Sequence, residues 1–344
     1  MITANDSIRH FENTKLLAIT GSHPQVRHAR IQDLGSFLQP GDVLVVNRSA
    51  TMPSSFSGIH KRDNVAMEIR LASFQGEGLH DLSRWYAIAF GEGDWRTPTE
   101  NRRLPPRLEV DDVIIVGRDL RIIVESVDTK FNRLVKIRFE SSDLIKNLYE
   151  FGKPIQYSYL RRPLAIWDQQ TIFAGPPISV EPPSASFALT WDQVFRLRER
   201  GVIICSILHG AGISSTGSEG LDAVLPLAEW YEVPQDTVNL IRSAKQMNQK
   251  IIALGTTVAR ALESAVSAGD LQAQSGFTTL KIGQHTRLSV VNGLISGLHA
   301  PGTSHLEMSK AFCSQEHIQR GYVEAERLGY RDHEFGDLSF LSCL

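Results

Sequence analysis

The chain has 344 residues, 36 of them Lys or Arg and 38 Asp or Glu, giving a formal net charge of −2. This length predicts two domains, and the near-neutral charge argues against a dedicated nucleic-acid binder, although a local basic patch would suffice for an RNA substrate. No apolar run reaches the length of a membrane span and the first residues do not resemble a signal peptide, so we expect a cytoplasmic protein.

The first part of the chain predicts one buried strand and then an all-β unit. Residues 43–47 are apolar up to Asn47, as in a strand that is buried on both faces. Short strands separated by glycine turns follow, at the spacing of a small barrel or sandwich; they are expected at 67–71, 85–90, 113–116, 120–124 and 134–139. We therefore predict an inserted barrel-like domain of residues 61–149 within a larger domain of residues 1–60 and 150–344.

Helices alternate with strands in the remainder of the chain. Residues 149–184 form a long connection rich in proline and aromatic residues, and such loops are often functional. A capping box at Thr190 and Gln193 starts a helix that ends at Gly201. Strands are then expected at 202–208, 251–254, 279–282 and 288–291, and helices at 234–249, from 256, at 304–312 and at 316–328. This alternation predicts an α/β domain with a mostly parallel sheet.

Cysteine and histidine spacing gives no sign of a metal or of a disulfide framework. The three cysteines are widely separated. Cys205 lies in an apolar run, which favours a core position over a reactive thiolate. No two histidines stand at helical ligand spacing beside a carboxylate, so we predict no metal.

Residues 251–264 predict a buried strand, a turn at Gly255 and a helix that opens on Thr256 and Thr257. The first N–H groups of such a helix favour an anion, because they lack partners and the helix dipole is positive there. A ligand carboxylate would also meet the two hydroxyls and Arg260. In the alternative, which these residues alone favour, a threonine only caps the helix and Arg260 pairs with Glu263 on the surface.

Two further segments place a histidine at or just beyond the end of a predicted strand. Gly210 and Gly212 come directly after His209, and the carboxyl ends of strands are where α/β sheets bind ligands. A plain glycine turn with a half-buried histidine fits these residues equally well. His299 lies on a loop between a strand and a helix, where an imidazole can move protons near neutral pH.

Weaker candidates lie at the end of the first strand and in the long connection. Asn47 ends its strand and is expected to line a crevice. Arg161 and Arg162, beside Tyr157 and Tyr159, are candidates for contact with an RNA or another acceptor, through phosphates and stacked bases. A solvated loop is the alternative for these residues.

Taken in order, several segments resemble the S-adenosylmethionine:tRNA ribosyltransferase-isomerase family of queuosine biosynthesis. The strongest match is Ile-Ala-Leu-Gly-Thr-Thr-Val-Ala-Arg-Ala-Leu-Glu-Ser at 252–264. The other matching segments are 38–47, 170–174, 208–212, 229–234, 299–301, 330–331 and 336–337. The resemblance spans nearly the whole chain and includes the place where the family carries an inserted β-barrel. It implies a transferase and isomerase with S-adenosylmethionine as substrate.

The chemistry implied by this resemblance moves the ribosyl part of S-adenosylmethionine onto a 7-aminomethyl-7-deazaguanine base in tRNA. The product is epoxyqueuosine, and adenine and methionine are released. The sulfonium acidifies the C5′ hydrogens, so a base can start the transfer, and adenine leaves more readily when an acid protonates it. The Gly255–Thr257 helix start would suit the methionine carboxylate.

The chain departs from the family pattern at two histidine positions, which here hold Ala188 and Leu227. Neither side chain can transfer a proton, which leaves His209, His299 and Glu229 as candidates for acid–base work. We expect a transferase that binds this small-molecule nucleoside and whose acceptor need not be the usual tRNA base. Two alternatives stay open: the usual tRNA reaction with rearranged acid–base residues, and an inactive nucleoside-binding paralogue.

Overall fold

Apolar strands build a large mixed sheet in the computed structural model, which describes residues 1–6, 13–300 and 302–343. Within these ranges nine strands pair in the order β18-β14-β13-β4-β15-β19-β21-β2-β3. The four central strands are parallel, namely β13 (Ile203–His209), β4 (Val43–Asn47), β15 (Ile251–Leu254) and β19 (Gly293–Gly297). The flanking strands are β18 (Gln274–Thr278), β14 (Glu229–Val233), β21 (Leu338–Ser342), β2 (Lys15–Thr20) and β3 (Gln25–Arg30).

Alternate residues of the central strands enter two separate cores, which explains their unbroken apolar runs. Val43 and Val45 face helices α4 (Gln235–Gln246) and α5 (Thr256–Ser264). Leu44 and Val46 face the opposite layer, which is made of η2 (Ile31–Ser36), η5 (Ser184–Ala188) and α2 (Trp191–Glu199). The capping box at Thr190 and Gln193 is present, as predicted. None of the helices in the described ranges is long and apolar enough to span a membrane.

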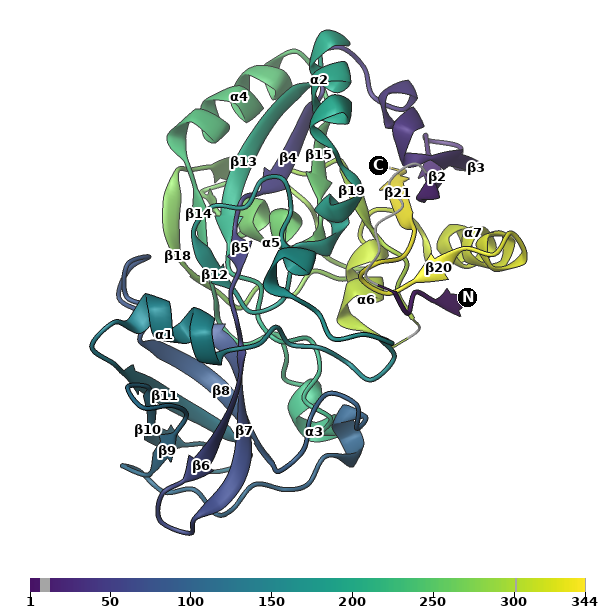
Figure 1. Ribbon diagram of the computed structural model, residues 1–344. Helices are drawn as coiled ribbons and strands as arrows, with labels where there is room; N and C mark the ends of the chain where they lie inside the picture. The colour runs from purple at the N-terminus through teal and green to yellow at the C-terminus, as the bar shows by residue number, and fades with distance from the viewer. Residues whose placement is uncertain (7–12, 301, 344) are drawn as a thin grey trace.

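The predicted barrel is confirmed as a closed structure below the sheet (Figure 1). Its strands are β6 (Ser55–His60), β7 (Val65–Phe74), β8 (Arg84–Gly91), β9 (Val113–Ile115), β10 (Arg121–Val127) and β11 (Leu134–Glu140). The expected start of the insertion at residue 61 thus falls after the first barrel strand, because β6 already pairs with β7 and β9. Closure leaves no free sheet edge, so this small domain presents side chains rather than unpaired backbone.

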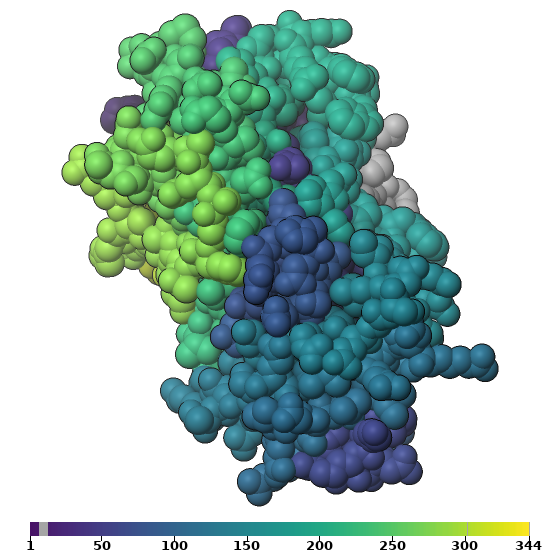
Figure 2. All heavy atoms as spheres, turned by 90° about the vertical axis from the view of Figure 1, so that its left-hand side faces the viewer, coloured from purple at the N-terminus to yellow at the C-terminus, as the bar shows by residue number. Residues whose placement is uncertain are grey.

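The barrel packs directly against the sheet domain (Figure 2). The end of β7 makes the contact: the Ala72 carbonyl accepts a hydrogen bond of 2.9 Å from the Ile213 N–H. The Ser73 hydroxyl donates to the Ala228 carbonyl. The inserted domain therefore fixes both the loop after β13 and the residue directly before β14.

Shorter elements complete the fold. They are β1 (Ile2–Thr3), β5 (Ala50–Thr51), η3 (Thr99–Asn101), α1 (Leu144–Phe151), η4 (Ile166–Gln169), β12 (Pro177–Ser179), α3 (Glu219–Asp222), β16 (Val266–Ser267), β17 (Asp270–Leu271), α6 (Ser304–Ser309), α7 (Gln315–Arg327) and β20 (Arg331–Asp332).

The strands predicted at residues 279–282 and 288–291 are wrong. The chain has no regular secondary structure at 279–282 and bends at residues 289 and 290, after β18 has ended at Thr278. The Glu263 carboxylate accepts the backbone N–H groups of residues 289–291, so a side chain satisfies the donors that a neighbouring strand would otherwise bind. The apolar residues of both segments pack on the core, which gave them their strand-like pattern.

The expectation of no disulfide is also wrong. Cys313, between α6 and α7, is bonded to Cys343 at the end of the chain, with the two Cα atoms 5.1 Å apart. The sequence separation of 30 hides this pairing, because α7 folds back before β21 returns to the sheet. Cys205 is half-buried and packs against the main core, and burial raises the pKa of its thiol to about 12.

Replacing Cys313 and Cys343 together by serine is expected to lower the free energy of unfolding by about 3–4 kcal/mol, because the bond closes a loop of this length in the unfolded chain. Urea denaturation of the variant and of the native protein measures the change. Cys205→Ser is the matched control and keeps the bond. Identical unfolding of the native protein with and without reductant would contradict the expectation.

Candidate active site

Asn47 ties together the ends of two parallel strands and the start of a helix. Its Nδ2 donates to the His209 carbonyl at 2.9 Å and to the Thr257 hydroxyl at 3.2 Å. Its Oδ1 accepts from the N–H groups of His209 and Ser49. Both amide atoms are fully used and the side chain is buried, so Asn47 fixes the geometry of this sheet end.

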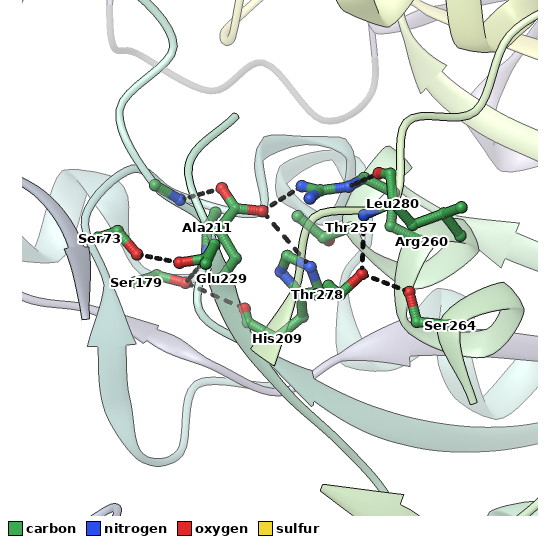
Figure 3. A network of polar contacts seen from close by, with 12 residues as sticks. Ser73, Ser179, His209, Ala211, Glu229, Thr257, Arg260, Ser264, Thr278 and Leu280 are labelled. Atoms are coloured by element: carbon green, nitrogen blue, oxygen red, sulfur yellow. Dashed lines mark hydrogen bonds and ion pairs between the residues drawn. The ribbon is translucent and has the colours of Figure 1, made fainter. Parts of the chain in front are cut away.

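Glu229 is the centre of a buried polar network (Figure 3). One oxygen accepts the Gly212 N–H at 2.6 Å, and the other accepts from Arg260 and lies 3.5 Å from His209 Nε2. Arg260 also donates through Nε to the Leu280 carbonyl at 3.0 Å. The structure thus brings together three residues that the sequence placed on separate elements.

His209 is fully buried rather than half-buried. Burial, and then the charge of Arg260, lower the pKa of its imidazole well below the usual range. Within the described ranges neither ring nitrogen makes a hydrogen bond. The lowered pKa favours the neutral form of this imidazole.

The loop after β13 requires glycine, because its backbone lies very close to neighbouring atoms. A Cβ at Gly212 would lie 2.5 Å from the Ala72 carbonyl oxygen and 2.8 Å from Glu229 Oε1. A Cβ at Gly210 would lie 2.7 Å from the Ile178 carbonyl oxygen. Only glycine fits at either position, so the loop can bring its backbone against both the barrel and the carboxylate.

Helix α5 starts without a side-chain cap. Gly255 is the N-cap residue, with φ of +100°, and no side-chain cap hydrogen bond is made. The alternative in which a threonine caps this helix and Arg260 pairs with Glu263 is therefore wrong. Thr256 and Thr257 are half-buried at this positive end of the helix dipole.

His299 lies in a second group of rings. It stacks on His305 with ring centroids 4.8 Å apart. Burial and the charges of His305 and His333 lower the pKa of His299 well below the usual range. Burial and the charge of Arg260 lower the pKa of His305 to about 4, which connects this group to the Glu229 network.

The remaining sequence candidates lie in the long connection between α1 and α2. Arg161 and Arg162 are exposed, and Arg162 pairs with Asp6 at 2.6 Å. Tyr157 and Tyr159 do not form a solvated loop: their hydroxyls donate to Glu181 and Glu334. Sequence reasoning missed both carboxylates, because neither stands in a spacing that signals a site.

The two positions that lack the family's histidines lie in apolar surroundings. Ala188 is buried in η5 and packs with the layer that covers the sheet. Leu227 is half-buried against the barrel core. In the described part of the chain, no group of three or more His, Cys, Asp and Glu side chains is arranged to hold a metal ion.

A mixed sheet with an inserted closed barrel, and a buried cluster of titratable side chains at the strand ends, define an α/β protein with a candidate active site, and comparison with known proteins identifies the family. The profile described as "Queuosine biosynthesis protein" matches residues 1–341. The chain therefore belongs to the queuosine biosynthesis protein family, whose members are transferase-isomerases, as the sequence resemblance predicted.

Individual relatives agree with this assignment. The S-adenosylmethionine:tRNA ribosyltransferase-isomerase of Heliobacterium modesticaldum is 30% identical over 332 residues, covering 94% of this chain and 91% of that protein. The enzyme of the same name from Thermus thermophilus is 30% identical, covering 97% and 94%. The crystal structure of S-adenosylmethionine tRNA ribosyltransferase from Thermotoga maritima is similar in fold, with a TM-score of 0.53, 20% identity and coverage of 98% and 96%.

Arg260→Ala is expected to lower the free energy of unfolding by about 3–5 kcal/mol, because it leaves the Glu229 carboxylate buried without its cation. Urea denaturation measures this loss, and adding Glu229→Ala should recover part of it.

The matched control is Arg320→Ala, which removes an exposed pair with Glu324 within α7 and should change stability by less than about 0.5 kcal/mol. Unchanged stability of Arg260→Ala would mean that the pair with Glu229 is not structural.

Proposed function

We propose that this chain transfers the ribosyl part of S-adenosylmethionine to a base acceptor, with release of adenine and methionine. The observation that supports this most strongly is the Asn47 contact, which holds His209 and Thr257 at one sheet end. That contact holds the backbone of His209, a residue whose burial favours the neutral imidazole, and the hydroxyl of Thr257 at the uncapped start of α5. A donor with a carboxylate at one end and an acidic C5′ at the other fits such a pair of groups.

The proposed roles follow from this geometry. The start of α5, with Gly255, Thr256 and Thr257, receives the methionine carboxylate, and the Gly210–Gly212 loop brings its backbone to the nucleoside. Arg260 keeps Nη2 without a hydrogen-bond partner in the described ranges, so it retains one donor for the ligand. His209 and His299 are the proton-transfer groups, and Glu229 positions His209.

The acceptor is proposed to differ from, or to be held differently than, the usual tRNA base, because Ala188 and Leu227 supply no imidazole. The usual tRNA-modifying reaction, carried out with rearranged acid–base residues, is the second candidate. The supply of other titratable groups around Glu229 favours it, because these can replace the missing histidines. Arg161 and Arg162 are exposed and would be the contacts for RNA in that case.

Incubation with S-adenosylmethionine and tRNA carrying 7-aminomethyl-7-deazaguanine, or with the free base, is expected to release adenine. Chromatography follows adenine, and mass spectrometry of the acceptor identifies the product. His209→Ala should slow release by about 10²-fold or more while ligand binding persists, since it removes a general base.

His285→Ala, at an exposed histidine, is the matched control and should leave the rate unchanged. Binding without adenine release for every acceptor would favour an inactive paralogue. Calorimetry that detects no binding of S-adenosylmethionine at millimolar concentration would sink the proposal.

A further inference from the structure

A second imidazole lies directly against His299. The rings of His299 and His305 are stacked, with centroids 4.8 Å apart and planes 18° apart. His299 belongs to the loop that follows β19, and His305 is the second residue of α6. Both residues are half-buried, so two titratable rings occupy one partly exposed position beyond the carboxyl end of β19.

The backbone and one ring edge of His299 are set by its neighbours. Its N–H donates to the hydroxyl of Tyr322, on α7, at 3.3 Å, and burial raises the pKa of this phenol, which favours its uncharged form. Gly297, two residues earlier, has no side chain, and an added Cβ would lie 3.6 Å from Cε1 and 4.0 Å from Nε2 of His299. In the described ranges this buried Nε2 has no hydrogen-bond partner. Buried polar atoms almost always have one, so Nε2 is the atom that a bound substrate would engage.

The ring of His305 depends on the stack with His299. The His305 carbonyl accepts the Ser309 hydroxyl at 3.1 Å, but in the described part of the chain its imidazole takes part in no hydrogen bond and no ion pair. Glu307, on the same helix, pairs instead with Lys310 at 2.5 Å. Without a carboxylate partner in these ranges, the charged form of His305 is not stabilised.

The charges around the two rings favour their neutral forms. Burial, and then the charge of Arg260, lower the pKa of His305 to about 4. Burial, and then the charges of His305 and His333, lower the pKa of His299 well below its usual range. Asp332 is paired with His333, at 3.8 Å from its Nε2. Two positive rings in a stack repel each other, so the pair can take up one proton but strongly disfavours a second.

The two candidate proton-transfer histidines of the site differ in what faces them. His209 lies 3.5 Å from a carboxylate oxygen of Glu229, whereas His299 lies against another imidazole. The chain holds Ala188 and Leu227 where the family pattern has histidines. The ring stacked on His299 therefore gives the site a titratable group that these two positions do not supply.

We propose that His305 is a positioning residue for the proposed transfer: its stacked ring holds the His299 imidazole in place and makes the two rings one acid–base unit for a single proton. The inference rests on the proposed function and adds a residue to its proton-transfer groups. A proton removed from the substrate goes to His299 Nε2, and the same proton passes to the departing adenine. The pair thus ends the reaction in its starting state, and the protons balance.

Two replacements of His305 separate its charge from its stacking. His305→Phe keeps a ring that can stack but cannot be protonated, and His305→Ala removes both properties. The pH dependence of kcat/KM for adenine release from S-adenosylmethionine is measured for both. The acid limb should move to higher pH in both, because the charge that lowers the pKa of His299 is gone and His299 is protonated sooner as the pH falls. The plateau rate should stay within about threefold in His305→Phe and fall about tenfold or more in His305→Ala, which no longer positions His299.

A titration of the protein without substrate gives an independent readout. Nuclear magnetic resonance of isotope-labelled histidines follows the protonation of His299, and His299→Gln identifies its signal. The midpoint for His299 should be higher in His305→Phe than in the native protein. His23→Phe, at an exposed histidine between β2 and β3, is the matched control and should change neither this midpoint nor the acid limb.

An acid limb and a His299 midpoint that stay unchanged in His305→Phe overturn the proposal, and this variant decides the matter if His305→Ala fails to fold. A folded His305→Ala variant with an unchanged plateau rate overturns it as well. Turnover by the native protein with neither shift rejects the role of His305 alone. A raised midpoint without any turnover rejects the transferase activity and leaves the coupling of the two rings standing.

Discussion

The buried carboxylate of Glu229 is the contact on which the candidate site depends. It receives the guanidinium of Arg260 on α5 and the Gly212 N–H of the loop after β13, and it lies beside His209. A carboxylate with a side chain 6% exposed is tolerable only with such partners. The requirement to keep them in place fixes α5, β14 and the glycine loop relative to one another, and with them every other residue of the site.

The inserted barrel takes part in this arrangement. Its strand β7 supplies the Ala72 carbonyl to the glycine loop and the Ser73 hydroxyl to the residue before Glu229. The barrel thereby holds both the residue before the carboxylate and the loop that donates to it. An insertion that looks independent in its hydrophobic pattern thus contacts the candidate site of the other domain through one backbone carbonyl and one hydroxyl.

The parts of the fold that could be predicted from the sequence are those determined by residues close together in the chain. The alternate burial of Val43 to Val46 follows from strand periodicity, and the start of α5 from its glycine. Glu181 and Glu334 could not be predicted, because each is defined by a tyrosine brought to it from another segment. Arg260 shows the same limit: its helical spacing favoured Glu263, whereas burial against β14 selected Glu229.

The bond between Cys313 and Cys343 encloses the segment that carries His333 and Glu334. Phe335, the next residue, also stacks face to face on Phe187 with centroids 5.4 Å apart. A loop closed at both ends and clamped in its middle has few conformations left to lose. Much of the conformational entropy of this segment is therefore lost when the chain folds, and less is left to lose when a ligand binds.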